Sequence, residues 1–145
     1  MSKKIYIAVV FVLFSVLFVG CFGNSSRARA YTNLGSKEAL NGNFESAIEN
    51  YNRAIELDPS IAEAHFFRGN IYASMGNFEK AIEDCTEAIR LNPNLSVAYS
   101  IRGISYIKLG KDNEAIVDLE EALRLNPNDE SAKQALETAK FLRNF

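Results

Sequence analysis

Few residues of this chain have the chemistry for catalysis or metal binding. The chain has one histidine, His65, and beyond its N-terminal segment one cysteine, Cys85, which is too few ligands for a tetrahedral zinc site. Acidic pairs such as Glu83-Asp84 and Glu120-Glu121 offer carboxylates for an acid/base dyad, but on helices they are expected at exposed faces as solvating charges. The sequence therefore predicts no enzyme, no metal site and no cofactor.

The residues that end and pack structural elements recur every 34 positions. Four such series run through the chain: Gly35, Gly69 and Gly103; Gly42, Gly76 and Gly110; Ala47, Ala81 and Ala115; and Pro59, Pro93 and Pro127. A fixed period of this length is typical of stacked supersecondary units. The blocks are residues 28–61, 62–95 and 96–129, and stacked helical repeats present long concave surfaces for binding other chains.

Each block is predicted to form two helices that meet at its inner glycine. In the second block, apolar residues recur at a helical period both before and after Gly76. Gly76 suits the left-handed residue that ends a helix, and Pro93 stops the next helix because proline lacks a backbone donor. Gly69 and Gly103 fall within helices, where they permit the close approach of a neighbouring helix.

The repeat positions of His65 and Cys85 favour packing over chemistry. His65 takes the position that Tyr31 and Tyr99 hold in the other blocks, so we expect a packing residue; a ligand or a base is the alternative. Cys85 corresponds to Tyr51 and Leu119, which favours a buried structural thiol over a nucleophile.

Residues 130–145 are predicted to form a seventh helix. One apolar stripe runs along it: Ala132, Ala135, Leu136, Ala139 and Leu142. A solenoid needs such a terminal cap, because its last repeat would otherwise expose a stacking face.

The combined pattern resembles the tetratricopeptide repeat (TPR) over residues 28–129. In the third block the signature residues are Tyr99, Arg102-Gly103, Tyr106, Gly110, Ala115, Leu119, Ala122 and Pro127. The resemblance implies an all-α fold: a right-handed α-solenoid of three helix-turn-helix repeats with a C-terminal capping helix. Two positions depart from the family pattern, since Glu38 replaces a tyrosine and Asp112 replaces an aromatic residue.

In this family the first helix of each repeat lines a ligand groove. Carried over by repeat position, the resemblance implies the following groove residues: Thr32, Ser36, Glu63, Phe66, Asn70, Ser74, Val97, Ser100, Ile104, Ile107 and Lys108. Family members that bind acidic C-terminal tails place Lys, Asn and Arg where this chain has Thr32, Ser36, Phe67, Val97 and Ile101. The predicted ligand is therefore an extended or helical segment with apolar anchors. The alternative is that Phe66, Ile104 and Ile107 simply cover neighbouring helices.

The N-terminus has the layout of an export signal. Lys3 and Lys4 precede an uncharged apolar run at residues 5–19, and Gly20-Cys21 follows as in a bacterial lipobox. We expect residues 1–20 to be a signal peptide, Cys21 to be lipidated, and residues 21–27 to link it to the repeats. An uncleaved membrane anchor and ordinary signal cleavage after Ala30 are the alternatives.

Charge also limits the class of partner. Without Lys3 and Lys4 the chain has 14 basic and 18 acidic side chains, a net charge of −4, which argues against nucleic acid. The sequence thus predicts a membrane-tethered, non-enzymatic adaptor of the cell envelope that binds a protein or peptide partner. The alternative is a structural subunit of an envelope assembly that meets its partners through edge or convex surfaces.

Overall fold

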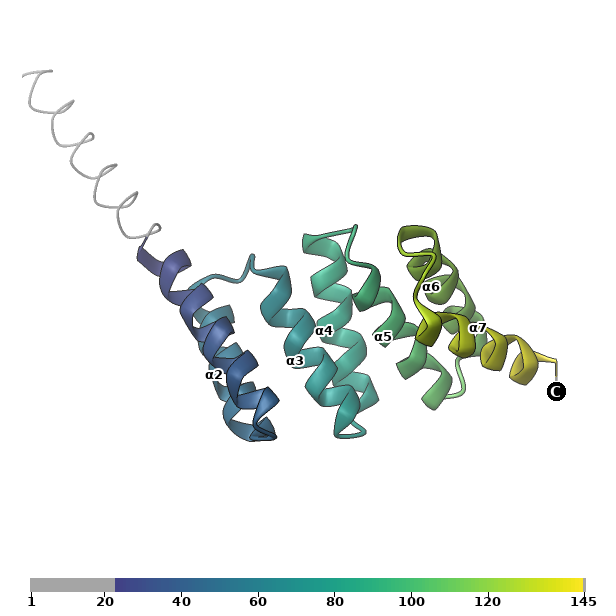
Figure 1. Ribbon diagram of the computed structural model, residues 1–145, viewed down its shortest axis with the longest axis horizontal. Helices are drawn as coiled ribbons and strands as arrows, with labels where there is room; N and C mark the ends of the chain where they lie inside the picture. The colour runs from purple at the N-terminus through teal and green to yellow at the C-terminus, as the bar shows by residue number, and fades with distance from the viewer. Residues whose placement is uncertain (1–22, 145) are drawn as a thin grey trace, which may run out of the picture.

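The computed structural model describes residues 23–144, and this part of the chain consists of helices and short turns. Residues 23–40 form the first helix, and six more follow: α2 (Phe44–Leu57), α3 (Ala62–Ser74), α4 (Phe78–Leu91), α5 (Ser96–Lys108), α6 (Asp112–Leu125) and α7 (Glu130–Arg143). The helices lie side by side in chain order along the molecule, and each of α2 to α6 packs against the next (Figure 1). The prediction of an all-α array of three helix pairs and a terminal helix is confirmed.

A glycine with positive φ ends the first helix of every pair. The φ angles of Gly42, Gly76 and Gly110 are 81°, 79° and 68°, in the left-handed region that glycine adopts without a steric penalty. One residue further on, the Asn77 N–H donates to the Tyr72 carbonyl at 2.8 Å. This bond closes the end of α3 and turns the chain into α4.

Successive pairs are joined by turns in which a side chain replaces a backbone acceptor. The Asn92 Oδ1 accepts a hydrogen bond from the Asn94 N–H at 3.1 Å, and Asp58 Oδ1 does the same for the Ser60 N–H at 3.0 Å. Pro93, between Asn92 and Asn94, has no N–H to continue α4. The residues that end the helices are therefore also those that shape the turns.

Small residues set the distance between the two helices of a pair. A Cβ atom on Gly103 would lie 2.7 Å from the Leu119 Cγ, and one on Gly69 would lie 3.0 Å from the Asp84 Cβ. Ala81 and other alanines of the second helices are fully buried at the same interfaces. The close approach expected at these glycines is confirmed.

Two arginines bridge three successive helices each. The Arg68 guanidinium of α3 donates two hydrogen bonds to Asp84 of α4, at 2.6 and 2.8 Å, and one to the Asn52 Oδ1 of α2 at 2.6 Å. Thirty-four residues further on, Arg102 of α5 makes the equivalent contacts. It donates two hydrogen bonds to Asp118 of α6 and one to the Thr86 hydroxyl of α4. We call these six residues the arginine ladder.

The arginine ladder corrects one expectation from the sequence. The acidic pair at Glu83-Asp84 was expected on an exposed helix face, but Asp84 is only 6% exposed. Burial raises the pKa of the Asp84 carboxyl, but the hydrogen bonds and charges of Arg68 and His65 together outweigh burial, so the pKa lies below the ordinary value. Asp84 therefore remains ionised and ties α4 to α3.

Helix α7 covers the end of the array. Its Ala132, Leu136 and Ala139 are buried in one apolar cluster with residues of α6, as a capping helix requires. The Asp129 carboxylate accepts the Ala132 N–H at 3.0 Å and so caps the start of α7. Leu142, although on the predicted stripe, remains 42% exposed. The buried stripe of the cap is therefore shorter than the sequence predicts.

The first helix begins before the first repeat. Residues 23–27, expected to be a linker, are helical and continue into residues 28–40, whereas α3 and α5 begin at the repeat boundary. Cys21 and the apolar run at residues 5–19 lie outside the described residues. Within residues 23–144, no helix is both long and apolar enough to cross a bilayer.

Candidate functional site

Two neighbouring hollows lie between the first helix and α3. The first, which we call the polar hollow, has a volume of about 380 Å³. It is lined by Ser25, Arg29, Thr32, Asn33, Asp58, Ser60, Ile61, Glu63 and Phe67. The second, the apolar hollow, has a volume of about 440 Å³. It is lined by Ser36, Ala39, Leu40, Phe44, Tyr51, Phe67, Asn70, Ile71 and Ser74.

Phe67 of α3 is shared by the two hollows. Its ring stacks on the Tyr51 ring, with centroids 5.9 Å apart and an interplanar angle of 23°. The centroid of the Phe66 ring lies 5.2 Å from that of Phe67. These ring contacts restrain Phe67, which contributes to the lining of both hollows.

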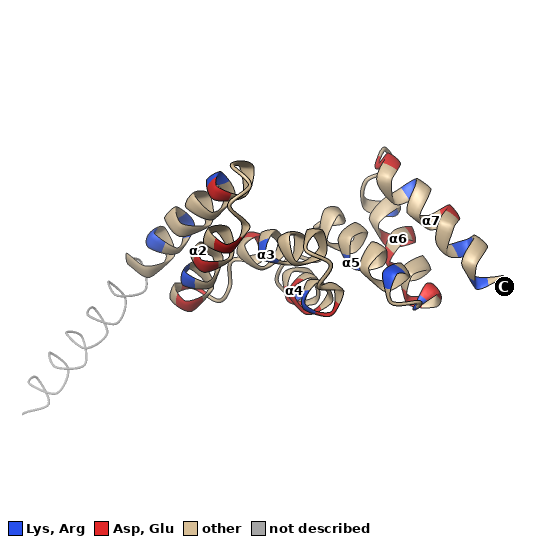
Figure 2. Ribbon diagram, turned by 90° about the horizontal axis from the view of Figure 1, so that it is seen from below, with Lys and Arg blue, Asp and Glu red and all other residues tan. Residues whose placement is uncertain are grey.

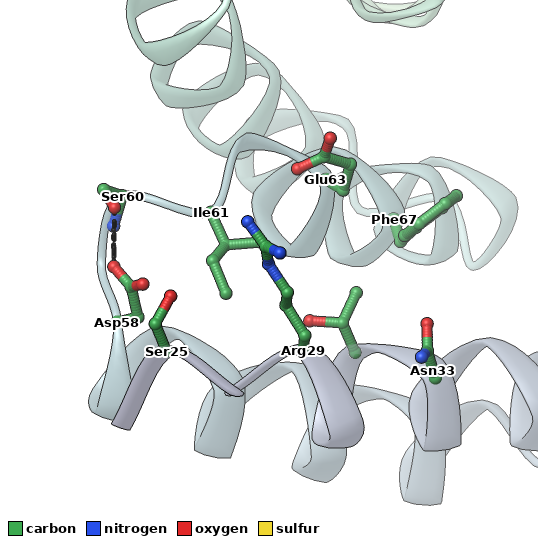
Figure 3. Close-up of a pocket in the computed structure, with 9 residues that line it drawn as sticks. Ser25, Arg29, Asn33, Asp58, Ser60, Ile61, Glu63 and Phe67 are labelled. Carbon is green, nitrogen blue, oxygen red and sulfur yellow. Dashed lines mark hydrogen bonds between the residues drawn. The ribbon is translucent and has the colours of Figure 1, made fainter. Parts of the chain in front are cut away.

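The polar hollow combines charges of both signs (Figure 3). Asp58 accepts hydrogen bonds from the Ser60 N–H and hydroxyl, and these bonds, with one from Ser25, lower the pKa of the Asp58 carboxyl. The Arg29 side chain reaches into the hollow between Ile61 and Glu63 (Figure 3). No ion pair within 4 Å is found for the Arg29 guanidinium among residues 23–144, but its charge also lowers the pKa of the Asp58 carboxyl.

The apolar hollow has aliphatic and aromatic walls with a polar rim. Leu40, at the end of the first helix, lines this hollow and is 89% exposed. On the rim, the Ser36 hydroxyl lies 3.2 Å from the Tyr51 hydroxyl, and Ser74 donates to the Asn70 carbonyl at 2.9 Å. None of the residues lining this hollow carries a charge.

Two carboxamides at the hollows have no internal partner. The Asn33 side chain in the polar hollow and the Asn70 side chain in the apolar hollow form no hydrogen bond within the described residues. A carboxamide can donate and accept at once, which matches the needs of a peptide group. Asn33, on the first helix, lines the polar hollow, and Asn70, on α3, lines the neighbouring apolar hollow.

The predicted groove residues are divided between these hollows and other places. Thr32 and Glu63 line the polar hollow, while Ser36, Asn70 and Ser74 line the apolar hollow.

Phe66 instead packs against the buried cluster that contains Cys85 and Ala98. Ser100 is buried and donates to Asp129 at 2.8 Å, so its hydroxyl supports the cap of α7. The groove positions of the third repeat lie outside both hollows.

Among these third-repeat positions, Ile104 and Ile107 pack against the cluster of α6 and α7. Val97 is 39% exposed, and Lys108 is exposed at the end of α5. Both isoleucines thus cover neighbouring helices, as the alternative to a ligand-binding role stated.

Several lining residues were absent from the predicted groove, among them Arg29, Asn33 and Phe67. A signal for Asn33 and Phe67 existed, because they occupy the same repeat position, 34 residues apart. A signal for Arg29 existed as well, because it occupies the repeat position of the predicted groove residues Glu63 and Val97.

His65 and Cys85 have structural surroundings. The His65 Nε2 lies 3.3 Å from the Pro59 carbonyl oxygen, and its Nδ1 lies 3.7 Å from the Asp84 Oδ1. Cys85 is fully buried, and burial raises the pKa of its thiol to about 12, so the reactive thiolate is suppressed. Residues 23–144 contain no cluster of three or more His, Cys, Asp or Glu side chains that could hold a metal ion.

Comparison with known families decides the affiliation of the chain. The profile described as "Tetratricopeptide repeat" matches residues 62–95 and 96–129, and the profile described as "TPR repeat" matches residues 35–76. The chain belongs to the tetratricopeptide repeat family. The TPR fold is a non-catalytic protein-binding scaffold.

Solved TPR domains share this architecture. The first TPR of Spaghetti (RPAP3), bound to the HSP90 peptide SRMEEVD, is 30% identical with a TM-score of 0.81, covering 83% of this chain and 96% of that one. The second TPR domain of human RPAP3, in complex with the HSP70 peptide SGPTIEEVD, is 32% identical with a TM-score of 0.74, covering 83% and 98%.

The Arabidopsis OM64 TPR domain is 25% identical with a TM-score of 0.78, covering 81% of this chain and 98% of that domain. A search of curated proteins by sequence gave no match.

Proposed function

We propose that this TPR protein is a non-enzymatic adaptor that binds a segment of a partner protein in the two hollows beside Phe67. The observation that carries the proposal is the pairing of free carboxamides, Asn33 and Asn70, with an uncharged hollow that an exposed leucine borders. Such a site offers hydrogen bonds to a ligand backbone and burial to a ligand side chain. Similar TPR domains were solved with peptides bound, which favours the same class of ligand here.

A crosslinking experiment tests this proposal. A photocrosslinking amino acid in place of Asn70, in the full chain in its native cells, should give one discrete crosslinked protein after irradiation. The matched control is the same amino acid in place of Val117, which is 67% exposed on α6 and lines neither hollow. Equal products from the two positions, or none from Asn70, would contradict binding in the hollows and favour the structural-subunit alternative.

We further propose that the adaptor is tethered to a membrane of the cell envelope through a lipidated Cys21. The support is the sequence: a basic start, the apolar run at residues 5–19 and Gly20-Cys21. Two or more acyl chains give stable anchoring, whereas one chain binds only marginally. Mass spectrometry of the native protein should find residues 1–20 removed and lipid added. A native N-terminus at Met1 or Ser2 would exclude lipidation and leave the uncleaved anchor.

A further inference from the structure

The chemistry of the hollows specifies the ligand more closely. We infer that the bound segment is anchored by a large apolar side chain, carries no net negative charge, and needs no free C-terminal carboxylate. This inference rests on the proposed function and narrows it, because the similar RPAP3 domains were solved with the acidic peptides SRMEEVD and SGPTIEEVD.

Two of the arginines that could meet an acidic tail, Arg68 and Arg102, are already engaged. Arg68 is the only Lys or Arg of α3, and its guanidinium is committed to Asp84 and Asn52. Arg102 of α5 is committed in the same way to Asp118 and Thr86. Moving either arginine to a ligand would leave a buried carboxylate without its counter-charge, which is costly.

The charges at the hollows also disfavour an acidic ligand. In the polar hollow, Arg29 is the single cation, and it shares the space with the carboxylates of Asp58 and Glu63. The local net charge is therefore −1, from one positive and two negative side chains. Along α2 to α7 Lys and Arg are interspersed with Asp and Glu, whereas the first helix carries Arg27, Arg29 and Lys37 against Glu38 (Figure 2).

The apolar hollow is suited to a side chain with no charge. Leu40, Phe44 and Ile71 contribute to its walls, and a carboxylate placed among them would lose water without gaining a partner. Its volume of about 440 Å³ lies within the range of pockets that bury a small ligand, so it can take a leucine or an aromatic ring.

The groups that recognise the ligand backbone differ from those that select its side chain. Asn33 and Asn70 can each hydrogen-bond a peptide group of any sequence, because they read the backbone and not the side chain. Selectivity then falls to the apolar hollow, where an aliphatic or aromatic anchor buries its surface against Phe67.

Peptide binding to the full chain in lipid nanodiscs tests the inference. The probes are fluorescent, C-terminally amidated peptide pools with a fixed central Leu, Phe or Asp, together with SRMEEVD carrying a free carboxylate. We expect the Leu and Phe pools to bind at least about tenfold more tightly than the Asp pool and SRMEEVD, a factor typical of one interface anchor. Their affinity should change little between about 0.1 and 1 M salt, since salt screens charge pairs and not apolar burial.

Three variants assign the effect to the hollows. Leu40→Asp places a charge at the border of the apolar hollow, at a site exposed enough to leave folding intact, and should weaken the Leu pool about tenfold. Val117→Asp is the matched control on α6 and should bind as the parent does. Arg29→Ala removes the one cation that lines the polar hollow and tests whether any binding of SRMEEVD depends on it.

The outcomes separate the inference from the proposed function. Tighter binding of SRMEEVD that is lost in Arg29→Ala would overturn the inference and leave the proposed function intact. Failure of the Leu and Phe pools to bind, or equal weakening by Leu40→Asp and Val117→Asp, would also overturn the inference. The crosslinking experiment at Asn70 then decides the proposed function independently, because it assumes nothing about ligand chemistry.

Discussion

Removal of one arginine of the arginine ladder should destabilise the whole array. In Arg102→Ala, the Asp118 carboxylate loses two hydrogen bonds of 2.7 and 2.8 Å while it remains buried, with its side chain 7% exposed. Breaking a buried pair from one side costs about 3–5 kcal/mol. Since the Arg102 side chain is itself 17% exposed, water can partly replace it, and we expect a loss of about 3 kcal/mol.

Urea titration followed by far-UV circular dichroism measures this loss. For an m-value of about 2 kcal/mol/M, a loss of about 3 kcal/mol lowers the urea midpoint by about 1.5 M. The matched control is Arg90→Ala, because Arg90 pairs with Glu87 on the exposed surface of α4, and such pairs contribute little. Its midpoint should stay close to that of the parent.

A double variant separates the charge from the packing. Arg102→Met combined with Asp118→Leu removes both charges and keeps much of the volume, so it should recover most of the lost stability. The reasoning is refuted if Arg102→Ala and Arg90→Ala shift the midpoint equally, or if the double variant is no more stable than Arg102→Ala.

Four other changes have defined outcomes. The pKa of Asp84 is lower in the folded than in the unfolded protein, so ionised Asp84 stabilises the fold at any pH above its unfolded-state pKa. This stabilisation is lost as the pH falls through the folded-state pKa. Acid titration should therefore destabilise the parent more than the combined variant Arg68→Met, Asp84→Leu. Gly76→Ala should cost about 1–2 kcal/mol in urea titration, from backbone strain at φ 79° and not from a clash. Deletion of Glu130–Phe145 should lower the melting temperature or cause aggregation, because it uncovers the cluster on α6; an unchanged monomer would refute the cap. A thiol reagent should leave Cys85 unmodified in the native protein and modify it in urea, and rapid native labelling would contradict its burial.

The order and ends of the helices could be predicted because their signals are local. Gly76 and Pro93 act through their own backbone geometry, and repetition at 34 residues shows that their positions are not accidental. The three helix pairs and the terminal helix therefore follow from spacing alone. The helical state of residues 23–27 was not accessible in this way, since they precede the repeated pattern.

The candidate site was harder to predict because it depends on the arrangement of helices. Phe66 and Phe67 are adjacent and chemically identical, but they point about 100° apart on α3. Only the position of the first helix decides that Phe67 lines both hollows while Phe66 packs toward Cys85. The local helical pattern of α4 likewise did not distinguish buried Asp84 from its exposed neighbour Glu83.

The burial of Asp84 did leave a trace in the sequence. Arg68 and Arg102 are 34 residues apart, and so are Asp84 and Asp118. Two opposite charges that recur together at the repeat period, 16 residues apart each time, indicate a contact between the two helices of a pair. Solvating charges have no such requirement to recur together.

The arginine ladder also determines where this array can grow. A second copy of residues 62–95, inserted after Leu95, would place the new Arg68 beside the existing Thr86, which is the contact that Arg102 already makes. An inserted interior unit therefore repeats, at the arginine ladder, a contact that the protein already contains. The two ends differ, because the first repeat has Leu34 at the arginine position, and Glu120, at the Thr86 position of the last repeat, pairs with Lys140 of α7. Duplication of the middle repeat would thus preserve the arginine contact between repeats. At the two ends of the repeat array, Leu34 and the Glu120–Lys140 pair take the place of that contact.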